Sequence, residues 1–353
     1  MKTPKFNNFF KRKPKQLEAP SSRITSDTLV EHREQVLAGG RKFKYPMQYA
    51  RHRLVINTII ISVSALLLLV VLGWYALYKA QNTSEFMYHV TRVIPVPVAV
   101  VDGQPVRYSS YLMKYRSSVH YLVEKEQVDI NSESGKQQLA YVKERAMSSA
   151  IAEAYAAKLA KQLNISVSDA DYEAYLTQQR QSDDGEVSVA AYNAIIQDHY
   201  NWSPGEYKDA MKSQLLRQKV AYAVDSSADE LVKKVESKIS AGQTSLETIA
   251  SELNAEKAEA VTYWPEAWLP RSNDDGGRTA AAAKLLVGQI SPVFKAKNGD
   301  GYYIVKLLNQ NEQQVQYAFI NIPLSEFNSK LETALGSDST EKYIAVETST
   351  TQE

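Results

Sequence analysis

The chain has 353 residues, and its 41 Lys or Arg and 40 Asp or Glu give a formal net charge of +1. It has no cysteine, which excludes disulfides, thiolate metal sites and cysteine nucleophiles within the chain. The small net charge hides an asymmetry, because 13 of the basic residues but only four of the acidic ones precede residue 54.

The N-terminal arm, residues 1–53, is basic and has too few apolar residues to build a core, so we expect it to be largely disordered. A short helix is predicted from Asp27 to Ala38, with Ser26 as its N-cap and Gly39-Gly40 as its stop. The charges suit anionic lipid headgroups or nucleic acid. Because no nucleic-acid module accompanies them, anionic lipid is the preferred partner and no nucleic acid is expected.

Residues 54–78 form an uncharged apolar segment, which predicts a single transmembrane helix. At about 1.5 Å per residue the helix spans roughly 37 Å, against about 30 Å for the hydrocarbon core of a bilayer. The length of the run disfavours a buried core helix, and the long arm before it disfavours a cleaved signal peptide. The basic arm places the N-terminus in the cytoplasm by the positive-inside rule. We therefore expect a single-pass protein of the cell membrane, with the later domains extracytoplasmic.

Composition divides the remaining chain into a stalk, two domains and a tail. Residues 79–97 are polar and then Pro-punctuated, as in a stalk, and residues 336–353 form a Ser/Thr-rich tail that we expect to be disordered. Residues 98–224 and 225–335 have the apolar content of two cores. The predicted fold class is mainly α with an α+β C-terminal domain.

Hydrophobic periodicity predicts that the first of these domains is a hairpin followed by helices. A turn at Asp102-Gly103 joins two short apolar strands between Val98 and Val106. Apolar residues then recur at helical spacing in four segments, Ser109–Lys125, Gly135–Asn164, Ser168–Leu176 and Ser203–Val220. Ser168 and Ser203 are the N-caps expected for the last two, and Pro204 suits the first position of its helix.

Three segments of this domain resemble the SurA, PrsA and PpiD group of extracytoplasmic foldases. They are VAVVDGQPVRYSSYLMKY, KLAKQLNISVSDADYEAYL and NWSPGEYKDAMKSQLLRQKV, and they follow one another in the order and spacing of that group between Val98 and Val224. The resemblance implies a helical SurA-N-like chaperone domain whose partners are unfolded or newly exported polypeptides.

Residues 221–309 resemble the parvulin-type prolyl isomerase domain that follows in the same group. The segments that carry this resemblance are AYAVDSSADELVKKVESKISAGQTSLETIASELN, TYWPEAWLP and VGQISPVFKAKNGDGYYIVKLL. Parvulins use two histidines, a Cys or Asp, and an apolar pair that grips the proline ring. The resemblance places Ala223 and Tyr303 at the two histidine positions and Arg278 near the pocket phenylalanine, and the loop with the Cys or Asp is deleted after Leu253. It implies a degenerate parvulin-like domain without catalytic residues.

Candidate substrate-binding residues in this domain are Trp264, Trp268, Tyr302 and Tyr303. Framework packing is the alternative role for the two tryptophans. The alternating strand Val315–Pro323, with a short helix over Ser325–Ala334, either closes the parvulin-like sheet or begins a second, truncated unit. No metal or cofactor is expected, because the five histidines are scattered and no nucleotide-binding motif is present.

The sequence thus favours an ATP-independent chaperone that holds polypeptides without catalysis. The 22 tyrosines suit adaptable contacts with clients, although most of them also suit helix packing. Two alternatives stay open: an active peptidyl-prolyl cis-trans isomerase with a non-standard site, and a structural cell-envelope protein that binds one dedicated partner.

Overall fold

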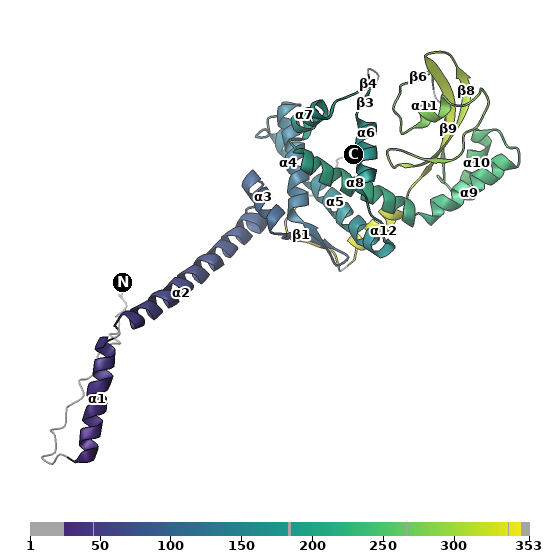
Figure 1. Ribbon diagram of the computed structural model, residues 1–353. Helices are drawn as coiled ribbons and strands as arrows, with labels where there is room; N and C mark the ends of the chain where they lie inside the picture. Colours follow the sequence, from purple (N-terminus) through teal and green to yellow (C-terminus); the bar gives the residue numbers. More distant parts are fainter. Residues whose placement is uncertain (1–24, 45, 183–184, 266, 338, 347–353) are drawn as a thin grey trace, which may run out of the picture. The chain divides into compact units, whose positions relative to one another are not determined.

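The computed structural model of the protein describes residues 25–44, 46–182, 185–265, 267–337 and 339–346 (Figure 1). The chain divides into two compact units that meet between Tyr75 and Ala76. The first contains the helices α1 (Ser26–Lys44) and α2 (Pro46–Trp74), and a π-helical turn η1 (Tyr75–Lys79) follows α2. Residues 1–24 of the predicted disordered arm lie outside the described residues.

Helix α1 is longer than the sequence predicted. Its predicted stop at Gly39-Gly40 is wrong, because the helix continues through both glycines to Lys44. Glycine ends a helix where it takes a left-handed conformation, and neither of these two has a positive φ. Their entropic cost of about 1 kcal/mol each is therefore tolerated inside the helix.

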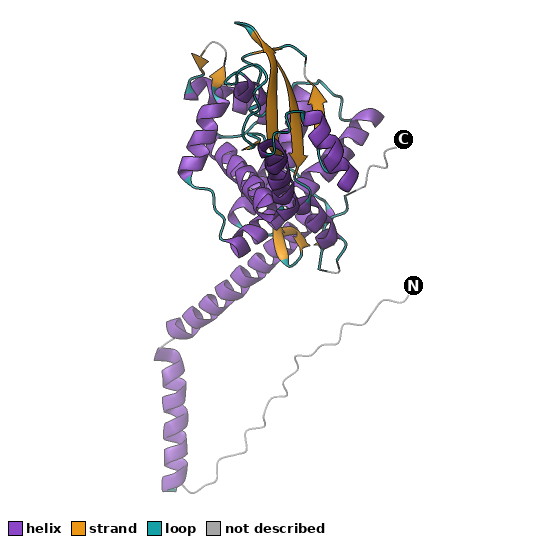
Figure 2. Ribbon diagram, turned by 90° about the vertical axis from the view of Figure 1, so that its right-hand side faces the viewer, coloured by secondary structure: helices purple, strands orange, loops and turns teal. Residues whose placement is uncertain are grey.

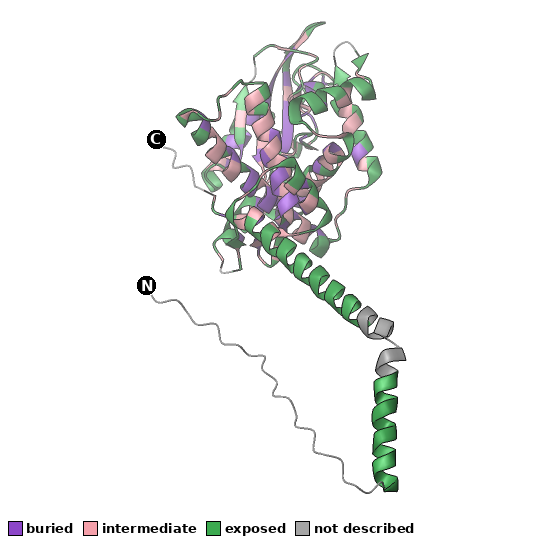
Figure 3. Cartoon of the chain, turned by 90° about the vertical axis from the view of Figure 1, so that its left-hand side faces the viewer, coloured by how far each residue is buried: buried purple, intermediate pink, exposed green. Residues whose placement is uncertain are grey.

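The apolar segment is helical from end to end. Among the described residues, one helix, His52–Lys79, is long and apolar enough to cross a membrane. Its side chains are exposed over most of its length (Figure 3). The end of this helix already belongs to the second unit, since Leu77 is only 5% exposed and packs in the core of that unit. The Tyr78 hydroxyl also donates to the Pro97 carbonyl at 2.6 Å, so both residues belong to the folded body.

The second unit consists of a helical lobe and a sheet lobe (Figures 1 and 2). The helical lobe contains α3 (Glu85–Val93), β1 (Pro97–Val101), β2 (Gln104–Arg107), α4 (Tyr108–Glu124), α5 (Glu133–Leu163), α6 (Asp169–Gln179), β3 (Gln181–Ser182), β4 (Gly185–Glu186), α7 (Val189–Tyr200), α8 (Pro204–Val224), α12 (Glu326–Leu335) and β10 (Glu341–Lys342). The sheet lobe contains α9 (Ser226–Ser240), α10 (Leu246–Glu256), β5 (Thr262–Pro265), β6 (Leu269–Pro270), α11 (Arg278–Ala282), β7 (Phe294–Lys295), β8 (Gly301–Gln310) and β9 (Gln314–Pro323).

Local sequence signals determine most elements of the helical lobe, and their predictions are confirmed. Asp102 and Gly103 both have positive φ, as the tight turn between β1 and β2 requires. Ser168 and Ser203 each accept a backbone hydrogen bond at the start of α6 and α8 and complete a capping box. Pro204 opens α8, where its missing N–H costs nothing.

The core of the helical lobe is rich in tyrosine. Its largest fully buried side chains are Tyr108, Tyr111, Leu112, Met147 and Ile151. The Tyr108 hydroxyl donates to the Leu77 carbonyl at 2.7 Å, so its polar end is satisfied inside the core. Many tyrosines therefore pack between helices and are not available at the surface.

Residues 79–97 are not a stalk, which corrects the prediction. They contain α3, which is capped by Ser84 and packs Tyr88 and Thr91 into the body at 7% and 1% exposure. Arg116 of α4 donates to the Thr83 carbonyl at 3.0 Å and holds the start of α3 in place. The segment is rich in polar residues and prolines, so composition alone concealed the helix.

The tail that was predicted to be disordered returns to the helical lobe. Strand β10 pairs with β1, and the Tyr343 N–H donates to the Val98 carbonyl at 3.0 Å. Ile344, which follows β10, is 5% exposed in the core of this lobe. Phe327 of the preceding α12 is 5% exposed in the same core. The prediction is wrong for the described residues up to 346, because the free edge of β1 provides backbone partners that composition does not show. Residues 347–353 lie outside the described residues.

In the sheet lobe, one antiparallel sheet has the strand order β5-β9-β8-β7, and β6 also pairs with β9. Alternate residues of β8 face opposite sides: Ile304 packs with α9 and α10, and Val305 packs with α11. Of the two alternatives for residues 315–323, the structure shows that the strand completes this sheet. Residues 221–224, which align with the parvulin opening, form the last turn of α8.

Candidate functional site

Exposed aromatic side chains of the helical lobe gather in a groove between α4, α5 and the end of α7. The groove has a volume of about 770 Å³. Its apolar lining, which we call the aromatic groove, consists of Tyr121, Leu122, Tyr141, Val142, Tyr200 and Trp202. Tyr121, Tyr141 and Tyr200 are 39%, 51% and 41% exposed, so each presents ring surface to solvent.

Helix geometry and one left-handed residue position these rings. Tyr141 and Arg145 lie four residues apart on α5, and Arg145 Nη1 donates to the Tyr141 hydroxyl at 3.0 Å. Asn201 ends α7 with a φ of 53°. The chain reverses there, and Tyr200 stacks on Trp202 with ring centroids 5.0 Å apart and an interplanar angle of 20°. The buried indole N–H of Trp202 has no hydrogen-bond partner within the described part of the chain.

A charged clamp fixes the α7 wall of the groove to α4. Lys125 Nζ lies 2.6 Å from Asp198 Oδ1, and a ring nitrogen of His120 lies 3.0 Å from the Asp198 carbonyl oxygen. The hydrogen bond from Lys125 holds the pKa of Asp198 below its usual value. The carboxylate is therefore ionised near neutral pH, as its ion pair with Lys125 requires.

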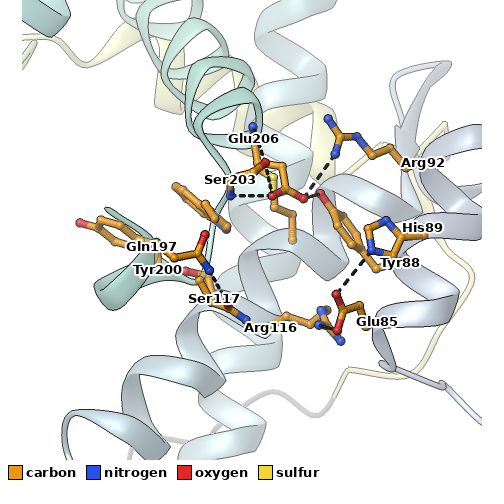
Figure 4. Close-up of a pocket in the computed structure, with 13 residues that line it drawn as sticks. Glu85, Tyr88, His89, Arg92, Arg116, Ser117, Gln197, Tyr200, Ser203 and Glu206 are labelled. Atoms are coloured by element: carbon orange, nitrogen blue, oxygen red, sulfur yellow. Dashed lines mark hydrogen bonds and ion pairs between the residues drawn. The ribbon is translucent and has the colours of Figure 1, made fainter. Parts of the chain in front are cut away.

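A second, more polar pocket of about 300 Å³ adjoins the groove and shares Ser117, Tyr200 and Trp202 with it (Figure 4). Glu206 is its centre, because it accepts hydrogen bonds from Ser203 at 2.6 Å and from the Tyr88 hydroxyl at 2.5 Å (Figure 4). Burial alone would raise the pKa of Glu206, but these hydrogen bonds lower it overall. This network joins α3 to the start of α8 and makes the pocket a structural junction.

In the sheet lobe, the structure brings together two of the residues that the parvulin resemblance singled out. The guanidinium of Arg278 lies 5.2 Å from the ring centroid of Tyr303 and 4.3 Å from that of Phe319. The Tyr303 hydroxyl donates to Asp300 at 2.8 Å, and the residue is only 5% exposed. The Arg278 guanidinium therefore covers apolar ring surface of Tyr303 and Phe319.

The other predicted site residues have different surroundings, although Trp264 is the cross-strand partner of Phe319. Tyr302 points to the opposite side of β8, is 8% exposed, and donates to Asp229 at 2.7 Å, so it is a packing residue. Ala223 is exposed in the last turn of α8. Trp264 and Trp268 are 58% and 39% exposed at β5 and just after it. The two tryptophans are therefore available for contacts with a ligand, whereas Tyr302 is not.

The segment before α11 holds a buried carboxylate, Asp275, that the sequence did not single out. Asp275 accepts hydrogen bonds from the backbone N–H of Thr279 at 2.9 Å and from its hydroxyl at 2.7 Å, and a further one from the Tyr317 hydroxyl. Burial would raise the pKa of Asp275, yet these donors lower it overall. An Asp four residues before a Thr, at the start of a helix, was the available signal.

Comparison with known proteins covers the first half of this architecture. Residues 47–221 match the family model of the SurA-like N-terminal domain. The matched range extends from the apolar helix to within the last turn of α8, and it includes all the residues of the aromatic groove. Neither the curated proteins nor the solved structures contain a match to the chain.

Proposed function

We propose that this protein, which carries a SurA-like N-terminal domain, is a membrane-anchored extracytoplasmic chaperone that holds unfolded or newly exported polypeptides without ATP. The aromatic groove is the observation that carries the proposal. Its exposed tyrosines offer large, amphipathic contact faces at low entropic cost and tolerate water when no client is bound.

Weak, reversible binding sets the apolar area that a client must bury. Micromolar affinity corresponds to about −8 kcal/mol, and association costs about 4–15 kcal/mol more. At about 25 cal/mol per Å², a client must bury roughly 500–900 Å² of apolar area. Such an area exceeds a small enclosed pocket and suits an open surface between helices, which is the form of the aromatic groove.

The apolar helix and the charge asymmetry support the membrane anchor. The helix spans His52–Lys79, and the residues before it carry the excess of Lys and Arg that stays in the cytoplasm. In this topology α3 and everything after it are extracytoplasmic, where exported chains emerge. Anionic headgroups are the partners we propose for the basic arm.

We further propose that the sheet lobe is a degenerate parvulin-like domain without isomerase activity. Twisting a prolyl bond, whose barrier is about 18–20 kcal/mol, requires hydrogen-bonding groups and an apolar wall that grips the ring. Here the Tyr303 hydroxyl is already hydrogen-bonded to Asp300, and the Arg278 guanidinium covers the ring of Phe319. The Ala76–Glu353 fragment is therefore expected to leave the isomerisation rate of a proline peptide unchanged. A rate gain that Tyr303→Phe abolishes would establish the alternative, an active isomerase.

The holdase proposal is tested by suppression of aggregation. The Ala76–Glu353 fragment, which retains Leu77 and Tyr78 in its core, is expected to slow the aggregation of several unrelated denatured proteins. The double variant Tyr141→Ser/Tyr200→Ser is expected to bind clients about thirtyfold more weakly, since each exposed contact tyrosine contributes about 1 kcal/mol. Light scattering and client titration measure both effects.

Leu286→Ser is the matched control, because Leu286 is 74% exposed in the sheet lobe and away from the aromatic groove. It is expected to behave as the unmodified fragment. Equal loss in both variants would contradict a role for the groove. Recovery of one stoichiometric complex after crosslinking, with no suppression of aggregation, would instead indicate a structural envelope protein with one dedicated partner.

A further inference from the structure

Helix α3 has an apolar face that no described part of the protein covers. Phe86, Val93 and Ile94 are 69%, 83% and 57% exposed. Phe86 and Val93 are seven residues apart, so they lie on one side of the helix, and Val90 lies between them. Single exposed apolar residues are ordinary, but a stripe on a helix of nine residues calls for a covering surface.

The other faces of α3 are already occupied. Tyr88 and Thr91 are buried against the body of the helical lobe. Glu85, Tyr88, His89 and Arg92 line the polar pocket beside α4 and α8 (Figure 4). The stripe lies on the remaining side, where a helix facing water normally carries polar residues. Helix α3 therefore has a buried side, a polar side that lines the pocket, and an exposed apolar side. The exposed apolar side is available for a further contact.

The position of α3 in the chain indicates what lies nearest to this stripe. Five residues separate η1, which ends at Lys79, from α3, which begins at Glu85. Fully extended, the chain between Lys79 and Phe86 reaches at most about 25 Å. Trp74 and Tyr75, at the end of the apolar helix, are 52% and 59% exposed and are the residue types that mark a membrane interface.

We propose that the apolar stripe of α3 docks on the lipid surface next to the anchor. This inference rests on the proposed membrane anchor, which keeps the stripe at high local concentration beside the bilayer. A short helix with Phe, Val and Ile on one side embeds that side at the boundary between headgroups and acyl chains. The contact gives the extracytoplasmic unit a second attachment, so that its orientation does not depend on the anchor alone.

The test uses the full-length protein in phosphatidylcholine and phosphatidylglycerol vesicles that contain a spin-labelled quencher lipid. Because the chain has no cysteine, single substitutions Leu67→Cys, Val93→Cys and Val287→Cys carry one fluorescent label each. Position 67 reports on the anchor, position 93 on the stripe, and position 287, which is 60% exposed in the sheet lobe, on the solvent. The label at 93 is expected to lose at least half as much emission as the label at 67, and the label at 287 almost none.

Two results separate this inference from the anchor on which it rests. If the label at 67 is quenched but the label at 93 behaves like that at 287, lipid docking is refuted and the anchor stands. If the label at 67 is not quenched, the anchor itself is refuted and the inference falls with it. Adding Phe86→Ser/Ile94→Ser to the Val93→Cys protein is expected to abolish quenching at 93 without changing the melting temperature. Unaltered quenching in this variant would overturn the role of the stripe.

Discussion

Removal of residues 336–353 is expected to lower the melting temperature of the Ala76–Glu353 fragment by about 5–10 °C. The deletion removes β10 from the edge of β1 and takes the buried Ile344 from the core of the helical lobe. Loss of one buried isoleucine side chain alone costs about 2–5 kcal/mol, and each kcal/mol shifts the melting temperature by about 2–4 °C. Thermal unfolding followed by circular dichroism measures the change.

Point variants separate the core contact from the length of the chain. Ile344→Ala is expected to reproduce most of the loss, whereas Lys342→Ala, at an exposed position two residues earlier, leaves the melting temperature unchanged. An unaltered melting temperature in the truncated fragment would mean that β10 contributes nothing to the stability of the lobe.

Asp225→Ala is expected to destabilise the same fragment by about 3–5 kcal/mol, because one buried carboxylate caps two helices. Asp225 is 1% exposed, and its Oδ1 accepts the N–H of Ala228 at 2.9 Å. Its Oδ2 accepts the N–H groups of Ser325 at 2.6 Å and Glu326 at 2.9 Å. The variant leaves three donors without their acceptor at the two points where the chain passes between the lobes.

Denaturant unfolding measures the free energy, and hydrogen exchange at Ala228, Ser325 and Glu326 shows where protection is lost. Asp274→Ala is the matched control, since Asp274 is an exposed aspartate of the sheet lobe. A loss of protection spread evenly over the fragment, with none specific to these three amides, would contradict the capping role of Asp225.

The helices of the first domain were predictable because their signals are local in the sequence. The order of the C-terminal tail was not predictable, because the tail pairs with residues far away in the sequence. Ser168 and Ser203 cap helices through residues three positions away, so the sequence contains the whole interaction. Thr340, by contrast, accepts a hydrogen bond from the Asp102 N–H across 238 residues. No periodicity in the tail records a partner that far along the chain, which is why its order was missed.

The candidate site was predictable in kind but not in place. The abundance of tyrosine suggested contact surfaces, yet Tyr108 and Tyr111 are core residues and Tyr141 and Tyr200 are exposed. All four occur in helices, and only the packing of α4, α5 and α7 decides which rings face water. The parvulin resemblance, in turn, singled out Arg278 and Tyr303, which are far apart in sequence but adjacent in space.

The sheet lobe is inserted into the helical lobe, since the chain leaves at the end of α8 and comes back with α12. During synthesis from the N-terminus, the helical lobe is therefore still incomplete when the sheet lobe emerges. The inserted part is continuous in sequence and has its own cores, so it can fold as soon as it emerges. The helical lobe is complete only after residues 326–346 have been synthesised. The usual order, in which the N-terminal domain folds first, is therefore reversed.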